Sequence, residues 1–134
     1  MIGVALSGKT TYREVNFTNH EVIALSYSDN NRNEEMRVIE EYLKEGKNIV
    51  VDDTNLTRKI RQMHIDLAKK YSAKIIGIFM NTSSNLLHQR QLRRHNPFPL
   101  VAINKQLKEL ETPLKEEGFD SLIVKKDYVQ PNGT

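Results

Sequence analysis

Residues 3–10 read Gly-Val-Ala-Leu-Ser-Gly-Lys-Thr and match the pattern G-x-x-x-x-G-K-[ST]. In this pattern glycines allow backbone N–H groups to surround phosphate oxygens, while Lys9 neutralises the outer phosphates and Thr10 coordinates magnesium. The helix that follows presents the positive end of its dipole to the same anion. The motif therefore predicts a strand, a phosphate-binding loop and a helix in that order. The alternative is an ordinary strand–turn–helix junction that needs two glycines.

The rest of the chain alternates apolar runs with helical periodicities, as expected for a sheet with crossover helices. We predict one three-layer α/β domain over residues 1–128, with a mostly parallel sheet of about five strands and helices on both faces, followed by a disordered tail over 129–134. Thr57 is predicted as a helix N-cap and Gly46 as a C-terminal stop. The expected strands cover residues 2–6, 22–26, 48–52, 74–80 and 121–124, and the expected helices cover 9–17, 33–45, 57–71, 83–94 and 100–110.

Only Met1 and Ile2 precede Gly3, although a phosphate-binding loop normally follows a buried parallel strand. Either the first strand is truncated, or the loop is shortened and residues 2–6 form the strand. We prefer the truncated strand, with Met1 an internal methionine taken as the start. The neighbouring strands would then carry unpaired backbone groups, which lowers stability.

The composition is that of a globular protein, with 38% hydrophobic and 28% charged residues. No run of about 18 apolar residues and no charged-then-apolar leader is present, which favours a cytoplasmic protein. The absence of cysteine excludes disulfides, thiolate metal sites and a cysteine nucleophile. The net charge of +3 is compatible with a polyanionic substrate.

Two carboxylates, Asp52 and Asp53, follow the apolar residues 49–51. In open α/β sheets ligands bind at the carboxyl ends of the strands, where a carboxylate can hold magnesium or grip an acceptor. We predict that Asp52 and Asp53 hold magnesium together with Thr10. The alternative is a turn whose polar residues only cap the helix that begins near Thr57.

A further polar cluster, Asp29-Asn30-Asn31-Arg32, follows the predicted strand over residues 22–26. Asp29 could accept a proton from an attacking hydroxyl while Arg32 holds a phosphate, since both would lie at the same sheet edge as the loop. The same residues are also good turn formers, so a purely structural turn remains the alternative.

Three arginines, Arg90, Arg93 and Arg94, end the predicted helix over residues 83–94. A planar guanidinium pairs bidentately with phosphate oxygens, so these arginines are suited to clamping a transferring phosphate. The alternative is that they are cations placed favourably at a helix C-terminus. The histidines show no metal-ligand spacing and are predicted to be incidental surface residues: His20, His64, His88 and His95.

In their order and spacing, these motifs resemble those of the P-loop kinases of the phage polynucleotide 5′-kinase type and related small ATP-binding proteins. Thr11-Tyr12 follows the loop as in that family, and Asp29 and Arg32 stand at the family's usual distance from Lys9. Further similarities are Asp53-Thr54-Asn55-Leu56, the positions of Arg90 and Arg94, and the segment over residues 112–120. Only the loop is specific in isolation, but together the similarities cover nearly the whole chain.

The resemblance implies a P-loop NTPase/kinase fold and transfer of the γ-phosphate of ATP, with magnesium, to a 5′-hydroxyl end of a nucleic acid. Asp29 would be the general base, and Arg32 and Asp53 would place the acceptor. The residues implied to bind ATP are Gly3, Ser7, Gly8, Lys9, Thr10, Thr11 and Arg94, and the residues implied in catalysis are Lys9, Asp29, Arg32, Asp53, Arg90 and Arg94.

Two departures from the family leave alternatives open. Asp53 follows Asp29 by only 24 positions, fewer than in the polynucleotide kinases, which favours a nucleoside, sugar or other small hydroxyl compound as an alternative acceptor. Ala5-Leu6 stands where the family favours Pro-Gly, so Leu6 should adopt a backbone conformation that glycine usually supplies, at a cost of about 1 kcal/mol. A degenerate or regulatory nucleotide-binding protein acting through a partner is the other alternative.

Overall fold

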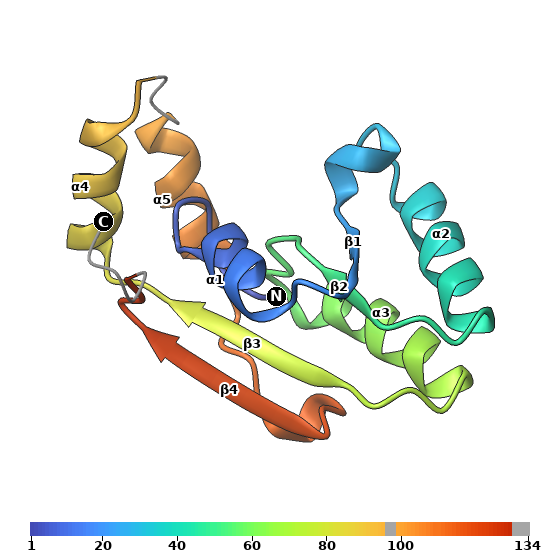
Figure 1. Cartoon of the computed structure of the whole chain (residues 1–134). Helices are drawn as coiled ribbons and strands as arrows, with labels where there is room; N and C mark the ends of the chain where they lie inside the picture. Colours follow the sequence, from blue (N-terminus) through green and yellow to red (C-terminus); the bar gives the residue numbers. More distant parts are fainter. Residues whose placement is uncertain (96–98, 130–134) are drawn as a thin grey trace.

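The structure is a computed structural model that describes residues 1–95 and 99–129, arranged as strands flanked by helices (Figure 1). Residues 130–134 of the predicted tail lie outside the described part. The helices are α1 (Lys9–Asn16), α2 (Arg32–Lys44), α3 (Arg58–Lys70), α4 (Ser84–Arg93) and α5 (Leu100–Glu109), with short 3-10 helices η1 (Leu25–Ser28) and η2 (Lys115–Glu117). The strands are β1 (Glu21–Ile23), β2 (Ile49–Val51), β3 (Ile76–Asn81) and β4 (Ser121–Lys126).

The strands form two parallel pairs, β1 with β2 and β3 with β4, which the first two residues join. The Met1 ammonium donates to Val51 O at 2.9 Å. Ile2 pairs with β3 in parallel: its N–H donates to Ile78 O, and its carbonyl accepts from Met80 N–H, each at 2.8 Å. The order across the sheet is therefore β1, β2, residues 1–2, β3 and β4, and the predicted parallel α/β class is confirmed.

The predicted strand over residues 2–6 is wrong, because only Ile2 pairs with a neighbouring strand in the described residues. Ala5 and Leu6 form a turn, so residues 3–8 form the loop and do not extend a strand. A cavity of about 480 Å³ is lined by Met1 and Ile2 and by residues of β2 and β3 on either side of them.

The other predicted elements are present with shifted ends. β1 ends at Ile23 because the chain turns into η1, where the Leu25 N–H is drawn to the Asp53 carboxylate at 2.7 Å. The predicted N-cap is confirmed, since Thr57 Oγ1 accepts from the Ile60 N–H at 3.3 Å. Gly46 follows α2 with φ 72°, as expected of a helix stop.

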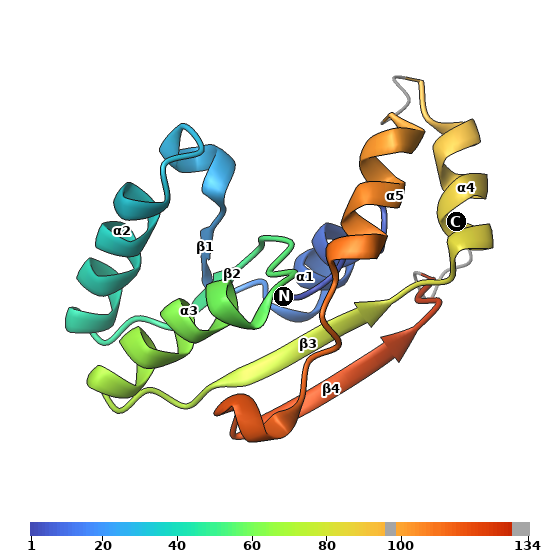
Figure 2. The ribbon, with the colours of Figure 1, turned by 180° about the vertical axis from the view of Figure 1, so that it is seen from behind.

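Helices lie on both faces of the sheet: α1 lies on one face, and α3 and α5 lie on the opposite face (Figure 2). Two buried apolar clusters fix these layers. One packs α1 on the central strands through Met1, Tyr12, Val50, Ile78 and Met80, and the other packs α4 and α5 beside the residues 4–6 through Val4, Leu56, Leu87 and Ile103. No helix in the described residues is long and apolar enough to cross a bilayer.

Candidate active site

The loop over residues 3–8 turns sharply between the short strand pairing of Ile2 and helix α1. Leu6 has φ 67°, in the left-handed region that L-residues avoid, and the conformation predicted for it is confirmed. Gly8 has φ 99° and begins α1 without a side-chain cap. The first turn of α1 therefore presents uncapped backbone donors to the space in front of the loop.

Groups from distant elements support the loop from outside. The Ala5 N–H donates to Gln106 Oε1 on α5 at 2.7 Å, and Thr82 Oγ1 donates to the Ser7 carbonyl at 2.9 Å. Arg90 Nη1 on α4 donates to the Leu6 carbonyl at 2.7 Å. Residues of α4 and α5, together with Thr82 directly after β3, therefore hold the loop backbone through side-chain hydrogen bonds.

Several polar groups of the loop have no protein partner in the described residues. The N–H groups of Leu6, Gly8 and Lys9 donate to no protein group, and Ser7 Oγ is buried without a hydrogen bond. Buried polar groups normally have partners, so orphaned donors grouped at a helix N-terminus indicate an anion site. The loop fits a phosphate group.

Lys9 lies against this anion site with its Nζ bonded to the Val4 carbonyl at 2.9 Å. Burial lowers the pKa of Lys9 to about 8, against the opposing influence of Asp52 and Asp53. A partly desolvated lysine gains more from an anionic ligand than an exposed one does.

Thr10 and Asp52 meet across the site, as predicted for a magnesium site. Thr10 Oγ1 donates to Asp52 Oδ2 at 2.9 Å, and Arg13 Nε donates to the same oxygen at 2.9 Å. A hydroxyl and a carboxylate are oxygen ligands of the kind that Mg²⁺ prefers. These two residues would hold a magnesium ion beside the loop.

Asp53 is turned away from Thr10 and toward α2. Its Oδ1 accepts from the Leu25 N–H at 2.7 Å, and its Oδ2 accepts from Arg32 Nη1 at 3.2 Å. Burial and the neighbouring Glu35 carboxylate raise the pKa of Asp53 to about 7. The structure therefore brings Asp53 together with Arg32, as the acceptor-side prediction requires, while of the predicted magnesium ligands only Asp52 contacts Thr10.

A buried residue that the sequence reasoning missed, Glu35, completes this cluster. Glu35 Oε1 accepts from Arg32 Nη1 at 2.8 Å and lies 2.9 Å from His64 Nε2 on α3. The prediction that His64 is an incidental surface residue is wrong, because its side chain is 13% exposed and contacts Glu35. The (i, i+3) spacing from Arg32 could have indicated Glu35, whereas no local signal indicated His64.

Asp29 ends η1 in the left-handed conformation, with φ 53°, and its side chain is exposed. Helix α2 follows directly, and Asn31 is its N-cap, since the Asn31 side chain accepts from the Glu34 N–H at 3.1 Å. Arg32 is the first residue of α2. Asp29 lies three residues before Arg32 in the sequence and makes no side-chain hydrogen bond within the described residues.

A second cavity, of about 550 Å³, connects the loop with α4. Arg90 is anchored there by the carbonyls of Leu6 and Tyr128, whereas Arg93 and Arg94 are exposed. The cavity brings together residues predicted to act on ATP, and its lining includes Gly8, Lys9, Thr10, Thr11, Arg90, Arg93 and Arg94.

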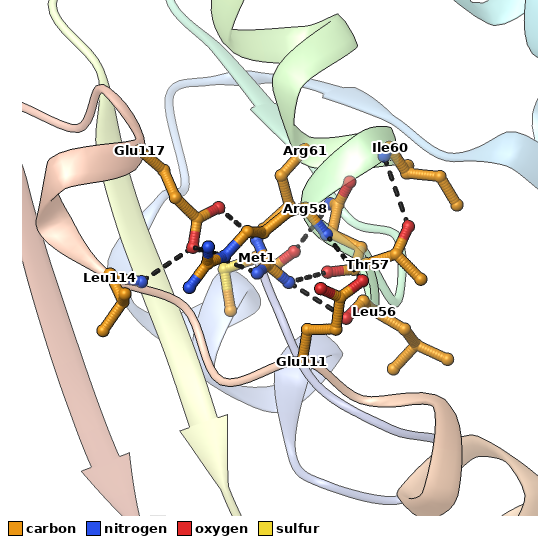
Figure 3. Close-up of polar contacts among 10 residues, drawn as sticks. Met1, Leu56, Thr57, Arg58, Ile60, Arg61, Glu111, Leu114 and Glu117 are labelled. Atoms are coloured by element: carbon orange, nitrogen blue, oxygen red, sulfur yellow. Dashed lines mark hydrogen bonds and ion pairs between the residues drawn. The ribbon is translucent and has the colours of Figure 1, made fainter.

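Arg61, on α3, hydrogen-bonds the backbone of the segment that follows Asp53 (Figure 3). It is 2% exposed, and its Nη1 donates to the carbonyls of Asn55 and Leu56 at 2.9 and 3.0 Å. Its Nε and Nη2 pair with both carboxylate oxygens of Glu117 at 2.8 and 3.1 Å. Although burial opposes ionisation, the hydrogen bonds from Arg61 and Leu114 keep the pKa of Glu117 below its usual range. Nothing local in the sequence signals this bidentate pair.

With this geometry established, comparison with known proteins places the chain. A family model described as an AAA domain matches residues 18–113. A bifunctional polynucleotide phosphatase/kinase of Schizosaccharomyces pombe is 28% identical over 133 residues, covering 91% of this chain and 31% of that protein. An L-seryl-tRNA(Sec) kinase of Methanococcus maripaludis is 26% identical over 95 residues, covering 71% of this chain and 37% of that protein.

The chain spans about a third of the length of these two relatives. The family match covers β1 to α5 and leaves the loop over residues 3–10 outside it, so the motif and the family match are separate observations. Both are consistent with the parallel α/β architecture and the loop geometry described above. The chain belongs to this AAA-domain family of P-loop kinase-like proteins.

Proposed function

We propose that this protein transfers the γ-phosphate of ATP, with magnesium, to the 5′-hydroxyl end of a nucleic acid. The observation that carries the proposal is the contact between Thr10 and Asp52 in front of a loop whose amides have no protein partner in the described part of the chain. Kinases of this type depend on positioning and charge stabilisation of the transferring group rather than on covalent catalysis. Magnesium, held by Thr10 and Asp52, would offset negative charge on the β and γ phosphates.

The proposed roles follow the two sides of the site. On the nucleotide side, the loop amides and Lys9 bind the phosphates, and Arg94 covers the transferring group. On the acceptor side, Arg32 and Asp53 place the acceptor, and Asp29 accepts the proton of the attacking hydroxyl. A bond forms between that oxygen and the γ-phosphorus while the bond to the β–γ bridging oxygen breaks, and ADP leaves.

The anchored position of Arg90 changes the part proposed for it. Its guanidinium spans from the loop carbonyl of Leu6 to the carbonyl of Tyr128, and burial lowers its pKa. We propose that Arg90 fixes the position of α4 relative to the loop. The exposed Arg94 then binds the phosphate.

A nucleic-acid acceptor is supported by the relatives, since the names of both refer to a polynucleotide or a tRNA. A smaller hydroxyl compound is the second candidate, because α2 begins at Arg32 and leaves little chain on the acceptor side. Competition between labelled nucleoside and 5′-hydroxyl oligonucleotides of increasing length separates the two. Competition that strengthens with length supports a nucleic-acid end, and length-independent competition supports the small acceptor.

The role of Asp29 has its own test. Asp29→Asn should abolish transfer while leaving ATP affinity unchanged, since the residue lies on the acceptor side. The exposed Asp66→Asn on α3 serves as the matched control. Undiminished transfer by the Asp29 variant would exclude it as the base.

A degenerate nucleotide-binding protein is the remaining candidate, favoured by the left-handed Leu6 and the short pairing of Ile2. It predicts ATP binding without turnover, measured by calorimetry and by release of ADP in the presence of each acceptor.

A further inference from the structure

Glu35 is the most deeply buried carboxylate of the cluster beside the site, with 0% exposure. Its Oε1 is shared by Arg32 and His64, and a side-chain hydrogen bond also joins its carboxyl group to that of Asp53. Apolar residues of similar volume can stabilise a protein as well as a buried charged cluster does, so stability alone does not account for this arrangement. We therefore looked for a functional role for the buried Glu35.

Arg32 is held by one end of its guanidinium only. Its Nη1 donates to both Glu35 Oε1 and Asp53 Oδ2, whereas Nε and Nη2 make no hydrogen bond within the described residues. The Arg32 side chain is 26% exposed, so a ligand can reach part of it from solvent. Nη1 of the guanidinium is therefore anchored, while Nε and Nη2 remain available to bind a ligand.

The ligand atoms of Glu35, Asp53 and His64 all lie within 4.8 Å of one another, which also raises the possibility of a metal ion. However, Arg32 Nη1 already lies on the two carboxylates and supplies the positive charge there. We therefore assign the cation position to the arginine rather than to an ion.

We propose that Glu35, fastened by His64 from α3, is a positioning residue that fixes the guanidinium of Arg32 for the phosphate next to the acceptor hydroxyl. The inference rests on the proposed function, because a 5′-hydroxyl end of a nucleic acid carries its nearest phosphate on the 3′ side of the same nucleotide. An arginine ordered in advance loses less conformational entropy when it binds, which is worth up to about tenfold in affinity. Glu35 itself touches neither substrate.

The binding test uses adenosine 3′-monophosphate, titrated by calorimetry without ATP, so that it needs no turnover. Glu35→Gln should weaken binding of this probe roughly 5- to 10-fold, with ATP affinity unchanged. Glu34→Gln is the matched control, because Glu34 is the preceding residue and pairs only with Arg37 on the surface among the described residues. In an Arg32→Ala background, Glu35→Gln should have no further effect.

His64 gives a second, milder variant if Glu35→Gln does not fold. His64→Ala should weaken the probe, and His64→Gln should restore binding because its amide can donate to Glu35. In turnover assays, Glu35→Gln should raise KM for the phosphate-bearing acceptor more than it lowers kcat.

The outcomes separate this inference from the proposed function. Probe binding by the wild type without transfer to any acceptor would refute the proposed function, while the Glu35 and His64 variants still decide the positioning role. The inference is overturned if the wild type does not bind the probe, if folded Glu35→Gln binds it like the wild type, or if the effects of Glu35→Gln and Arg32→Ala multiply. Manganese or zinc binding that His64→Ala abolishes would overturn it as well.

Discussion

Thr10 Oγ1 and Asp52 Oδ2 are joined by a hydrogen bond of 2.9 Å across 42 positions of the chain. The contact links the first turn of α1 to the residue after β2. It places a hydroxyl oxygen and a carboxylate oxygen side by side next to the phosphate-binding loop. The proposed magnesium-dependent phosphate transfer depends on this contact between Thr10 and Asp52.

Asp52→Asn preserves the size of the side chain but removes the charge that would hold the magnesium ion. We expect phosphate transfer at saturating ATP to fall roughly 100-fold, with a higher magnesium concentration needed for half-maximal rate. Steady-state transfer at varied magnesium measures both. Asp66→Asn, an exposed aspartate on α3, should behave like the wild type, and an equal loss in the two variants would refute the role of Asp52.

Gly3→Ala tests whether the loop needs its first glycine for space. A Cβ at Gly3 would lie 2.6 Å from Ser7 Oγ and 3.1 Å from the Met80 carbonyl, with φ at 156°. We expect the free energy of unfolding to fall by about 3 kcal/mol. At Gly46, with φ 72° and nothing within 4 Å, alanine should cost only about 1 kcal/mol from the backbone conformation. Thermal melts of the two variants should therefore separate, and coincident melts would contradict the crowding at Gly3.

Glu117→Ala tests the buried ion pair with Arg61. The side chains are 6% and 2% exposed, so removing Glu117 leaves an unpaired buried guanidinium and should destabilise the protein by about 3–5 kcal/mol. The exposed neighbour Glu116→Ala should change stability by no more than about 0.5 kcal/mol. Urea unfolding gives both values. A cost near that of Glu116→Ala would mean that Arg61 does not depend on this carboxylate.

Asp53→Asn tests the carboxylate with the raised pKa. Burial and the Glu35 carboxylate raise the pKa of Asp53 from 3.8 to about 7, so in this window the folded protein binds more protons than the unfolded chain. The contribution of Asp53 to stability therefore falls as the pH rises through the window. Asparagine does not titrate, so the stability of the variant relative to wild type should improve between pH 5 and pH 8. If the free energies of unfolding of Asp53→Asn and the wild type, measured in urea, change in parallel with pH, the pKa of Asp53 is not raised.

Local sequence rules predicted the features that depend on local physics. The phosphate loop and the cap at Thr57 follow from the preferences of a few neighbouring residues, while the left-handed Leu6 was predicted from the resemblance to the family, which favours glycine there. The alternation of side chains along a strand could also have separated Asp52 from Asp53, which turn to different partners although both were predicted to bind magnesium.

The features that local rules did not predict depend on pairings across the chain. Arg61 meets Glu117 56 positions away, and Glu35 meets His64 29 positions away. Both pairs join residues from separate elements, so the three-dimensional packing is needed to see them.

The most direct measurement is transfer of labelled γ-phosphate from ATP with magnesium to 5′-hydroxyl RNA, 5′-hydroxyl DNA and a panel of nucleosides, with Lys9→Ala in parallel. The proposed function predicts label on an oligonucleotide with the wild-type protein and none with the Lys9→Ala variant. Folded wild-type protein that labels no acceptor, or label that persists in Lys9→Ala, would contradict it.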